Sequence, residues 1–485
     1  MSSPPDASPA NPIVKKSVLL PAVGMAATSA MLLWGTGLHP LWWLTWLAPF
    51  PVLMISPRLP RGRAFWTAAL AWFLGSLNMW PYFLKAIALP IPIVLLFSAG
   101  PSWLFGSAVL LFRAFIRRGK PGKAALSFPA FWVTFEYVLN VTSRNGTFPN
   151  LGYTQMDFLP VLQVASLVGI WGITFSLLLF PAGAAAALSR PGTPQRKVRL
   201  AAAAGAFLAL VLGFGAWRLM STPQCAPSVK VGLTATGLPS PFPADDSATM
   251  QLLQIYADKA AGLAAQGAEL IILPEKIGLI SDQGSAQVDA LFAAAATRAK
   301  ASIVVGLDRG TRAQRVNEAR LYSPGGTRAA VYDKHHMVPG FEDVDRPGTT
   351  IAVLDQASGV WGMQICKDMD FPSLSRQYGA KGVGLLLVPA WDFTLDGWLH
   401  SRMAVLRGVE NGFTIVRSAK QGALAVSDDR GRILAEADCE TAASAALVAA
   451  APVRHDSTPY THLGDWFAWL NVAGLAALLF VQRRR

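Results

Sequence analysis

The chain has 485 residues, of which 52% are hydrophobic and only 15% are charged, and its formal net charge is +13. Soluble domains usually carry about 25% charged residues, so this composition argues against a wholly soluble protein. Abundant apolar residues exclude a disordered chain, and three cysteines are too few for a disulfide scaffold.

Eight apolar stretches have lengths near the ~20 residues that a helix needs to cross a bilayer. Seven precede residue 221, at 17–36, 39–57, 64–84, 87–116, 124–141, 159–189 and 200–220, and the eighth covers 464–481. The first could be a signal peptide, because Lys15 and Lys16 precede it, but six further stretches follow it closely. We therefore predict a multi-span α-helical membrane domain of seven helices at 17–220 and an eighth transmembrane helix at 464–482.

Charge divides the chain in the same way. Residues 1–220 hold 17 Lys and Arg against three acids, for a net charge of +14, whereas residues 221–482 hold 22 against 26, for a net charge of −4. The cations of the membrane half lie in every second connection, and cytoplasmic loops carry such an excess. This predicts a cytoplasmic tail at 1–16, a periplasmic domain at 221–463 and a cytoplasmic Arg tail at 483–485. The cations flank apolar runs rather than stacking aromatics, which argues against nucleic acid.

One acid, Glu136, lies inside an apolar stretch. A carboxylate at such a position is costly, so it is either a functional group or a paired structural one. The sequence favours neither interpretation.

From residue 228 to 452, short β-rich runs alternate with Ala-rich stretches. Runs such as SVKVGLTATG, AELIILPE and GVGLLLVPA are typical of buried strands, and residues 247–266 and 285–299 are typical of amphipathic helices. A segment of this size is large enough to fold as one α/β domain.

Three predicted strands end in polar residues: Glu275 after LIILP, Lys334 in AAVYDK and Cys366 in WGMQIC. Chemistry on α/β scaffolds concentrates where buried strands meet loops. Each residue alone is ordinary, because charged strand ends are usually solvated and a lone cysteine usually packs in a core. Together they form a nucleophile set, because a carboxylate can take the thiol proton and a lysine can stabilise the thiolate and the oxyanion.

The stretches LPEK, YDKHHMVPGFE and QICKDMDFP resemble, in this order, the three catalytic stretches of the nitrilase superfamily. FEYVLN, NLGYTQ, GIWGITF, HSRMAVLRGVENG and SDDRGRI extend the similarity to nearly the full length of the membrane-embedded apolipoprotein N-acyltransferase family of bacterial inner membranes. The resemblance implies an αββα sandwich in which Glu275 is the general base, Lys334 stabilises the oxyanion and Cys366 is the nucleophile. It also implies a supporting role for Glu342, which would position the lysine or assist proton transfer.

The resemblance further implies a two-step exchange. Cys366 would take an acyl chain from a phospholipid as a thioester, and the α-amino group of a diacylglyceryl-cysteine apolipoprotein would accept it. The protein would work as a monomer in the bilayer, without a cofactor. Five apolar residues are candidates to line the acyl path, although packing explains each of them at least as well: Met337, Phe341, Trp391, Phe393 and Trp398.

No metal is expected, because the sequence has no CxxC pair and no HExxH, and His335 and His336 are adjacent rather than on one helical face. A disulfide between Cys225 and Cys439 would suit an oxidising compartment.

The similarity is not uniform. Lys367 follows the nucleophile where an aromatic residue is expected, VPGFE replaces a Phe-Gly-Glu order, and VPAWDF replaces an Asn-containing strand end. Lys367 would either be solvated or add a cation beside the thiolate. These departures keep two alternatives open: a membrane-tethered amidase or nitrilase, and a divergent N-acyltransferase with another amine acceptor. A non-catalytic transporter or sensor is disfavoured, because a binding module has no need of the three catalytic stretches.

Overall fold

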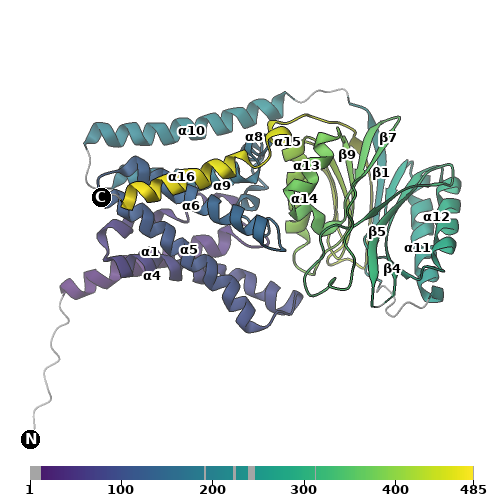
Figure 1. Cartoon of the computed structure of the whole chain (residues 1–485), viewed down its shortest axis with the longest axis horizontal. Coiled ribbons are helices and arrows are strands. Elements are labelled where there is room, and N and C mark those ends of the chain that lie inside the picture. The colour runs from purple at the N-terminus through teal and green to yellow at the C-terminus, as the bar shows by residue number, and fades with distance from the viewer. Residues whose placement is uncertain (1–11, 190–192, 222–225, 239–245, 312, 484–485) are drawn as a thin grey trace, which may run out of the picture. The chain divides into compact units, whose positions relative to one another are not determined.

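The structure, a computed structural model, describes residues 12–189, 193–221, 226–238, 246–311 and 313–483 (Figure 1). The chain divides into two compact units. The first unit comprises Met1–Phe135, Thr174–Ala209 and Asn471–Arg485, and the second comprises Glu136–Ile173 and Leu210–Leu470. The predicted domain boundaries near residues 220 and 463 stay a prediction.

Five helices in the described part of the chain are long and apolar enough to cross a membrane. They are α5 (Ile91–Arg117), α6 (Pro121–Thr142), α9 (Ile170–Leu188), α10 (Pro194–Met220) and α16 (Trp466–Arg483). In the first unit, α4 (Arg61–Gly75) packs against both α1 (Pro12–Gly35) and α5. These helices fit the predicted helical membrane domain, and the predicted count of eight spans stays a prediction.

Two of the predicted spans are not single helices. Residues 39–57 form α2 (Trp42–Thr45), α3 (Phe50–Ile55) and a 3₁₀ turn, Ser56–Arg58. Prolines at 40, 49, 51 and 57 interrupt this stretch, because proline has no N–H to donate. Residues 159–189 form α7 (Leu159–Leu162) and α8 (Ala165–Val168) before α9 begins. Gly169 has a φ of 68°, a conformation that ends α8.

A third predicted span is also not a single helix. The stretch 64–84 divides into α4, a 3₁₀ turn (Ser76–Met79) and a π turn (Tyr82–Ala86). In contrast, the stretch 87–116 corresponds to α5, which continues through Pro101 as one helix.

Glu136 is a buried, paired carboxylate. Its side chain is 7% exposed and accepts hydrogen bonds from Asn150 Nδ2 at 2.7 Å and from the backbone N–H of Leu151 at 2.8 Å. The acid therefore ties α6 to the 3₁₀ helix η4 (Leu151–Gln155), which favours the structural interpretation.

We expect Glu136→Ala to lower the free energy of unfolding by about 2–3 kcal/mol, because it leaves buried donors without an acceptor. Glu136→Gln keeps one acceptor oxygen and should cost about half as much. Thermal unfolding of the purified variants measures both effects. A fully folded Glu136→Gln protein without catalytic activity would instead assign Glu136 a functional role.

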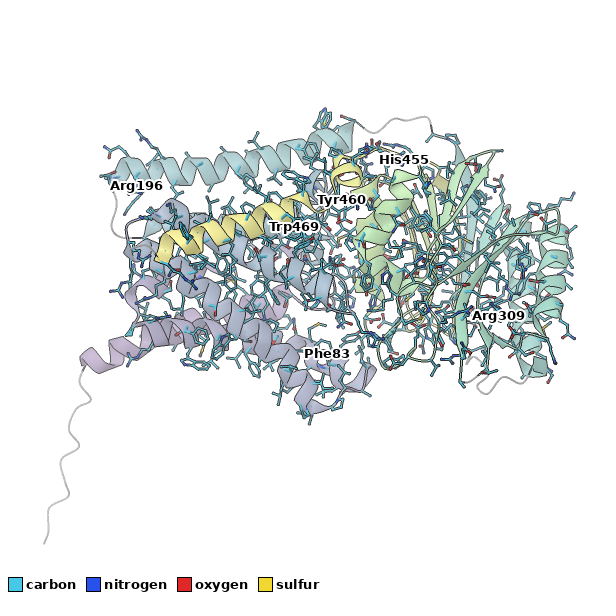
Figure 2. The ribbon with its side chains drawn as sticks, in the orientation of Figure 1. Phe83, Arg196, Arg309, His455, Tyr460 and Trp469 are labelled. Atoms are coloured by element: carbon cyan, nitrogen blue, oxygen red, sulfur yellow. The ribbon has the colours of Figure 1, made fainter. Side chains whose placement is uncertain are left out.

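Residues 460–469 pack on residues 136–173 within the second unit. The ring of Trp469 lies 5.3 Å from that of Tyr137. Asp465 accepts hydrogen bonds from Trp171 at 2.7 Å and Tyr460 at 2.8 Å. Figure 2 labels Tyr460 and Trp469 of this stretch.

Two mixed sheets form the centre of the second unit. The first has the order β13-β1-β2-β4-β5-β6, with β3 also paired to β4, and the second has the order β12-β11-β10-β9-β8-β7. The strands of the first sheet are β1 (Ser228–Thr236), β2 (Leu270–Ile272), β3 (Leu279–Ile280), β4 (Ser302–Gly310), β5 (Arg315–Tyr322), β6 (Arg328–Asp333) and β13 (Ser444–Pro452). The strands of the second sheet are β7 (Ala352–Gln356), β8 (Gly359–Met363), β9 (Leu385–Trp391), β10 (Thr414–Lys420), β11 (Ala423–Ser427) and β12 (Ile433–Asp438).

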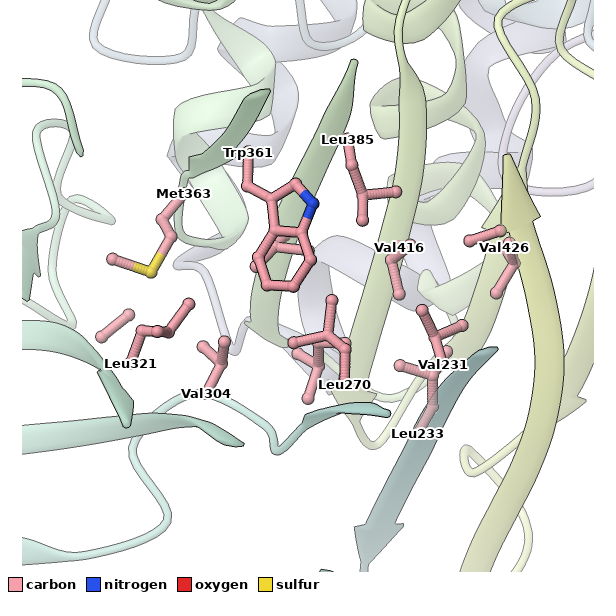
Figure 3. Packing of buried hydrophobic residues seen from close by; sticks show 14 of the residues in the cluster. Val231, Leu233, Leu270, Val304, Leu321, Trp361, Met363, Leu385, Val416 and Val426 are labelled. Atoms are coloured by element: carbon pink, nitrogen blue, oxygen red, sulfur yellow. The ribbon is translucent and has the colours of Figure 1, made fainter. Parts of the chain in front are cut away.

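The sheets pack face to face, and helices cover their outer faces. Leu270 of β2 and Leu385 of β9 both lie in the core between the sheets (Figure 3). Ile271 packs instead with α11 (Asp246–Ala265) and α12 (Ser285–Ala299), and Leu386 packs with α13 (Pro372–Ala380) and α14 (Gly397–Asn411). This alternation follows from the two-residue period of a strand, and it confirms the predicted αββα sandwich.

Candidate active site

The structure places the three predicted catalytic side chains after the ends of three strands, two in the first sheet and one in the second. Glu275 lies in the turn after β2, Lys334 directly follows β6, and Cys366 begins the 3₁₀ helix η5 (Cys366–Asp370) after β8. Lys334 Nζ lies 2.8 Å from Glu275 Oε1. Cys366 Sγ lies 3.5 Å from the carbonyl oxygen of Trp391. Cys366 has a φ of 41°, a strained conformation that a non-glycine residue keeps only where its surroundings enforce it.

The environment holds the thiol protonated and the lysine charged. Burial raises the pKa of the Cys366 thiol well above its usual value, Glu275 adds to this, and Lys334 opposes it. Burial opposes the charge on Lys334, but the adjacent Glu275 and Glu342 outweigh it and raise the pKa of Lys334 well above its usual value. A nucleophilic attack by this thiol therefore requires a base, and Glu275, the predicted base, is close enough to influence the thiol electrostatically.

Glu342 lies in the same cluster. Its Oε2 accepts hydrogen bonds from Lys334 Nζ and from the backbone N–H of Val338, both at 2.8 Å. Its Oε1 lies 2.7 Å from Lys276 Nζ and accepts a hydrogen bond from Asn317 at 2.9 Å. Burial favours the neutral acid, but Lys334 and Lys276 hold the pKa of Glu342 well below its usual value. Lys334 and Lys276 thus favour the ionised form of Glu342.

Sequence reasoning missed Asn317 and Lys276. Asn317 is fully buried in β5, and its Nδ2 donates to Glu275 at 2.6 Å as well as to Glu342. The signal in the sequence was weak: one amide within the strand RVNEARLY, and a lysine directly after the predicted base.

Asp368 holds the nucleophile turn against the Lys334 loop. Its carboxylate accepts hydrogen bonds from Tyr332 Oη at 2.7 Å and from the backbone N–H of His336 at 2.9 Å. Lys367 is only 9% exposed, and its Nζ lies 3.1 Å from Asp370 Oδ2. Of the two alternatives for Lys367, the solvated side chain is wrong, because its ammonium is paired with Asp370 inside the domain. The other alternative, a cation beside the thiolate, stays a prediction.

The segment that joins α6 to η4 also contacts the nucleophile turn. The carbonyl oxygen of Asp370 accepts hydrogen bonds from Thr147 N at 2.9 Å and from Thr147 Oγ1 at 2.7 Å. Gly146 has a φ of 55°, and a Cβ there would lie 2.5 Å from that same oxygen, so only glycine fits. Phe148 stacks on His400 with ring centroids 5.9 Å apart.

A buried ion pair influences the Cys366 thiol electrostatically. Asp392, directly after β9, makes a two-pronged ion pair with Arg417 of β10. Asp392, Asp396 and His400 bring potential ligand atoms within 4.8 Å of one another, the geometry of a metal site. However, Asp392 already accepts from Arg417, and His400 Nδ1 lies 3.0 Å from Asp396 Oδ2. These residues fit an ion-pair network better than a metal site, and the predicted absence of a metal stays a prediction.

The pair of His400 and Asp396 makes stability pH-dependent. Burial opposes the charge on His400, but Asp396 outweighs it and raises the pKa of His400 from 6.5 to about 9. Its stabilising effect is therefore complete below pH 6.5 and is lost as the pH rises through about 9. Over this pH window, we expect the free energy of unfolding of the native protein to fall by on the order of 2 kcal/mol more than that of His400→Gln. Thermal unfolding at a series of pH values measures the difference, and parallel curves for the two proteins would contradict it.

Two parts of the chain match models of known protein families. Residues 232–454 match the family model of carbon-nitrogen hydrolases, and residues 28–183 match that of the apolipoprotein N-acyltransferase N-terminal domain. The "Apolipoprotein N-acyltransferase" of Bradyrhizobium diazoefficiens is 31% identical over 69% of this chain and 68% of its own length. This chain belongs to the apolipoprotein N-acyltransferase family.

A second member of the apolipoprotein N-acyltransferase family, from Geobacter metallireducens, is 28% identical and covers 93% of this chain and 92% of its own length. Among solved structures, an amidase from Nesterenkonia sp. is 22% identical over 52% of this chain and 98% of its own length, with a TM-score of 0.42.

Five residues were suggested for an acyl path by the resemblance to apolipoprotein N-acyltransferases. Met337 and Phe341 lie in the loop after β6, Trp391 ends β9, Phe393 lies in the loop after β9, and Trp398 lies at the start of α14. Phe341 is 48% exposed, and its ring lies 4.8 Å from that of Phe393. Trp391 carries Lys420 over its ring at 4.3 Å, and Trp398 carries Arg402 at 5.4 Å. Met337 is half-buried, and it lies between Lys334 and Glu342 in the sequence. Their role in substrate binding stays a prediction, as do the catalytic roles of the cluster.

Cys225 lies outside the described residues, so the predicted Cys225–Cys439 disulfide stays a prediction. Cys439 itself is buried.

Proposed function

We propose that this protein transfers an acyl chain from a phospholipid to the α-amino group of a diacylglyceryl-cysteine apolipoprotein in the bacterial inner membrane. The observation that carries the proposal is the buried pair of Glu275 and Lys334 beside the Cys366 thiol. The chain's place in the apolipoprotein N-acyltransferase family supports this acceptor.

In the first step, Glu275 takes the proton from Cys366 Sγ, and the thiolate attacks the phospholipid ester carbonyl. Lys334 stabilises the oxyanion. The C–O bond then breaks, and the lysophospholipid alkoxide leaves with the proton from Glu275. The acyl chain remains on Cys366 as a thioester.

In the second step, the acceptor amine attacks the thioester carbonyl and gives a proton to Glu275. The C–S bond breaks, and Cys366 leaves as a thiolate that recovers this proton. The new bond is an amide, which is more stable than the thioester. Water must be kept from the intermediate, because hydrolysis would waste the acyl chain.

The proposed topology has eight membrane crossings, a periplasmic α/β domain and both termini in the cytoplasm, and the protein acts as a monomer. Five long apolar helices and the alternation of cationic connections support this arrangement. Labelling of single cysteines introduced near residue 120 and near residue 300 tests it, since only the latter should react from the periplasmic side.

The activity is tested with a phospholipid carrying an isotope-labelled acyl chain and a synthetic diacylglyceryl-cysteine peptide. We expect a labelled amide product whose formation depends on the peptide, with little free fatty acid. Release of labelled fatty acid at the same rate with and without the peptide would favour the tethered hydrolase instead.

A further inference from the structure

A second buried lysine contacts Glu342, at the carboxylate oxygen that Lys334 does not bind. Lys276 follows Glu275 in sequence and is 8% exposed. Its Nζ lies 2.7 Å from Glu342 Oε1, 2.7 Å from Asp345 Oδ2 and 3.5 Å from Asp308 Oδ1. A long side chain that is buried and held by three carboxylates is fixed in place.

The backbone at Lys276 is adapted to this placement. Its φ of 51° lies in the left-handed region, which costs free energy for a non-glycine residue and persists only where other contacts compensate. Here the compensating contacts are the ion pairs with Glu342 and Asp345.

Charges of opposite sign alternate through the site. Arg315 Nε lies 2.7 Å from Asp345 Oδ1 and continues the series beyond Lys276. Asp308 lies between Lys276 and Arg315, at 3.5 Å and 3.9 Å. In order, the series is Glu275, Lys334, Glu342, Lys276, Asp345 and Arg315.

Each oxygen of Glu342 has one lysine and one further donor. A carboxylate has about four acceptor positions, so Glu342 has no oxygen left to take a proton. Lys276 supplies one of these four contacts and one of the two cations. Without Lys276, Glu342 and Glu275 would share the ammonium of Lys334. No second cation would then offset the cost of burying the Glu342 carboxylate.

We infer that Lys276 is a positioning residue that keeps Glu342 ionised, and thereby keeps Lys334 charged and fixed beside the nucleophile. This rests on the proposed function, because it assigns the proton transfers to Glu275 alone and leaves Glu342 as a permanent anion.

Removing the positive charge of Lys276 should raise the pKa of Glu342, because this carboxylate then loses a neighbouring cation. The pKa of Asp308, already raised to about 7 by burial against the opposing effect of Lys276, would rise further. The charged and titratable groups around Glu342 are Glu275, Lys276, Asp308, Arg315, Lys334, Asp345 and Cys366.

Two pH profiles of the full chain in phospholipid nanodiscs test the inference. The first is the rate at which iodoacetamide alkylates Cys366, read from intact mass with Cys366→Ala as the blank. The second is the rate of acyl-enzyme formation with phosphatidylethanolamine. The variants are Lys276→Met, Lys276→Arg and, as a control that removes an exposed lysine, Lys381→Met.

We expect Lys276→Met to displace both profiles upward by about one pH unit and Lys276→Arg to restore the native profiles. Lys381→Met should match the native protein. If Lys276→Met does not fold, Lys276→Gln removes the same charge and keeps a hydrogen-bond donor. Unchanged profiles, or a uniform slowing at every pH, would overturn the inference, because a merely structural lysine does not move a titration.

The two measurements separate this inference from the proposed function. Alkylation needs no lipid, so a displaced alkylation profile without any acyl-enzyme would support the role of Lys276 and reject phospholipid as the donor. Acyl-enzyme formation that is identical in Lys276→Met and the native protein would support the function and reject the role of Lys276.

Discussion

The Cys366→Ala variant is expected to form no acyl-enzyme and to lose acyl transfer by roughly 10⁴-fold or more. The reason is that the thiol supplies the bond that carries the acyl chain between the two steps, and nothing replaces it. Alanine is small enough to fit the site. The backbone at this position keeps its left-handed conformation.

Intact mass after incubation with phospholipid and no acceptor measures the effect. The native protein should gain the mass of one acyl chain, and hydroxylamine should remove it. Cys439→Ala is the matched control, because Cys439 is a buried cysteine of the same domain and should leave the adduct intact. An acyl adduct that persists in Cys366→Ala would place the nucleophile elsewhere.

The Glu275→Gln variant is expected to slow acyl-enzyme formation by about 10²–10⁴-fold, the usual contribution of a general base. Burial holds the thiol of Cys366 protonated, so the reaction cannot start without a group that takes its proton. Glutamine has nearly the same shape and can still accept the hydrogen bond of Asn317 at Oε1. The variant should therefore fold, and the loss reports chemistry rather than structure.

Single-turnover acylation at several pH values measures this loss, with thermal unfolding as the check on folding. Raising the pH should recover part of the rate in Glu275→Gln, since hydroxide can then deprotonate the thiol. A variant that acylates at the native rate at neutral pH would show that another group is the base, and Glu342→Gln would then be the next candidate to compare.

The alternation of apolar residues predicted the sandwich because it is a local property. In the run Leu270–Ile272, successive side chains must point to opposite faces of the sheet, whatever the rest of the chain does. The strand ends with Glu275, Lys334 and Cys366 could be located for the same reason. Hydropathy also located the long helices α5, α6, α9, α10 and α16.

Helix breaks were less predictable, because the apolar length of a segment does not reveal its backbone path. The stretch 159–189 is apolar almost throughout, yet Gly169 divides it. Only the packing around that glycine, whose missing Cβ would lie 2.5 Å from the ring of Tyr460, shows why the break occurs there.

What the sequence by itself determined is the family, the sandwich and the identity of the three reactive side chains, since each depends on local pattern or on motifs read in order. Only the tertiary structure decided which groups surround them. Asn317 reaches Glu275 across 42 residues and Thr147 reaches Asp370 across 223. Such contacts depend on strand register and chain packing, which no local pattern encodes. Lys276 is the clearest case: its place in the sequence beside Glu275 says nothing of its side chain, which the fold turns toward Glu342.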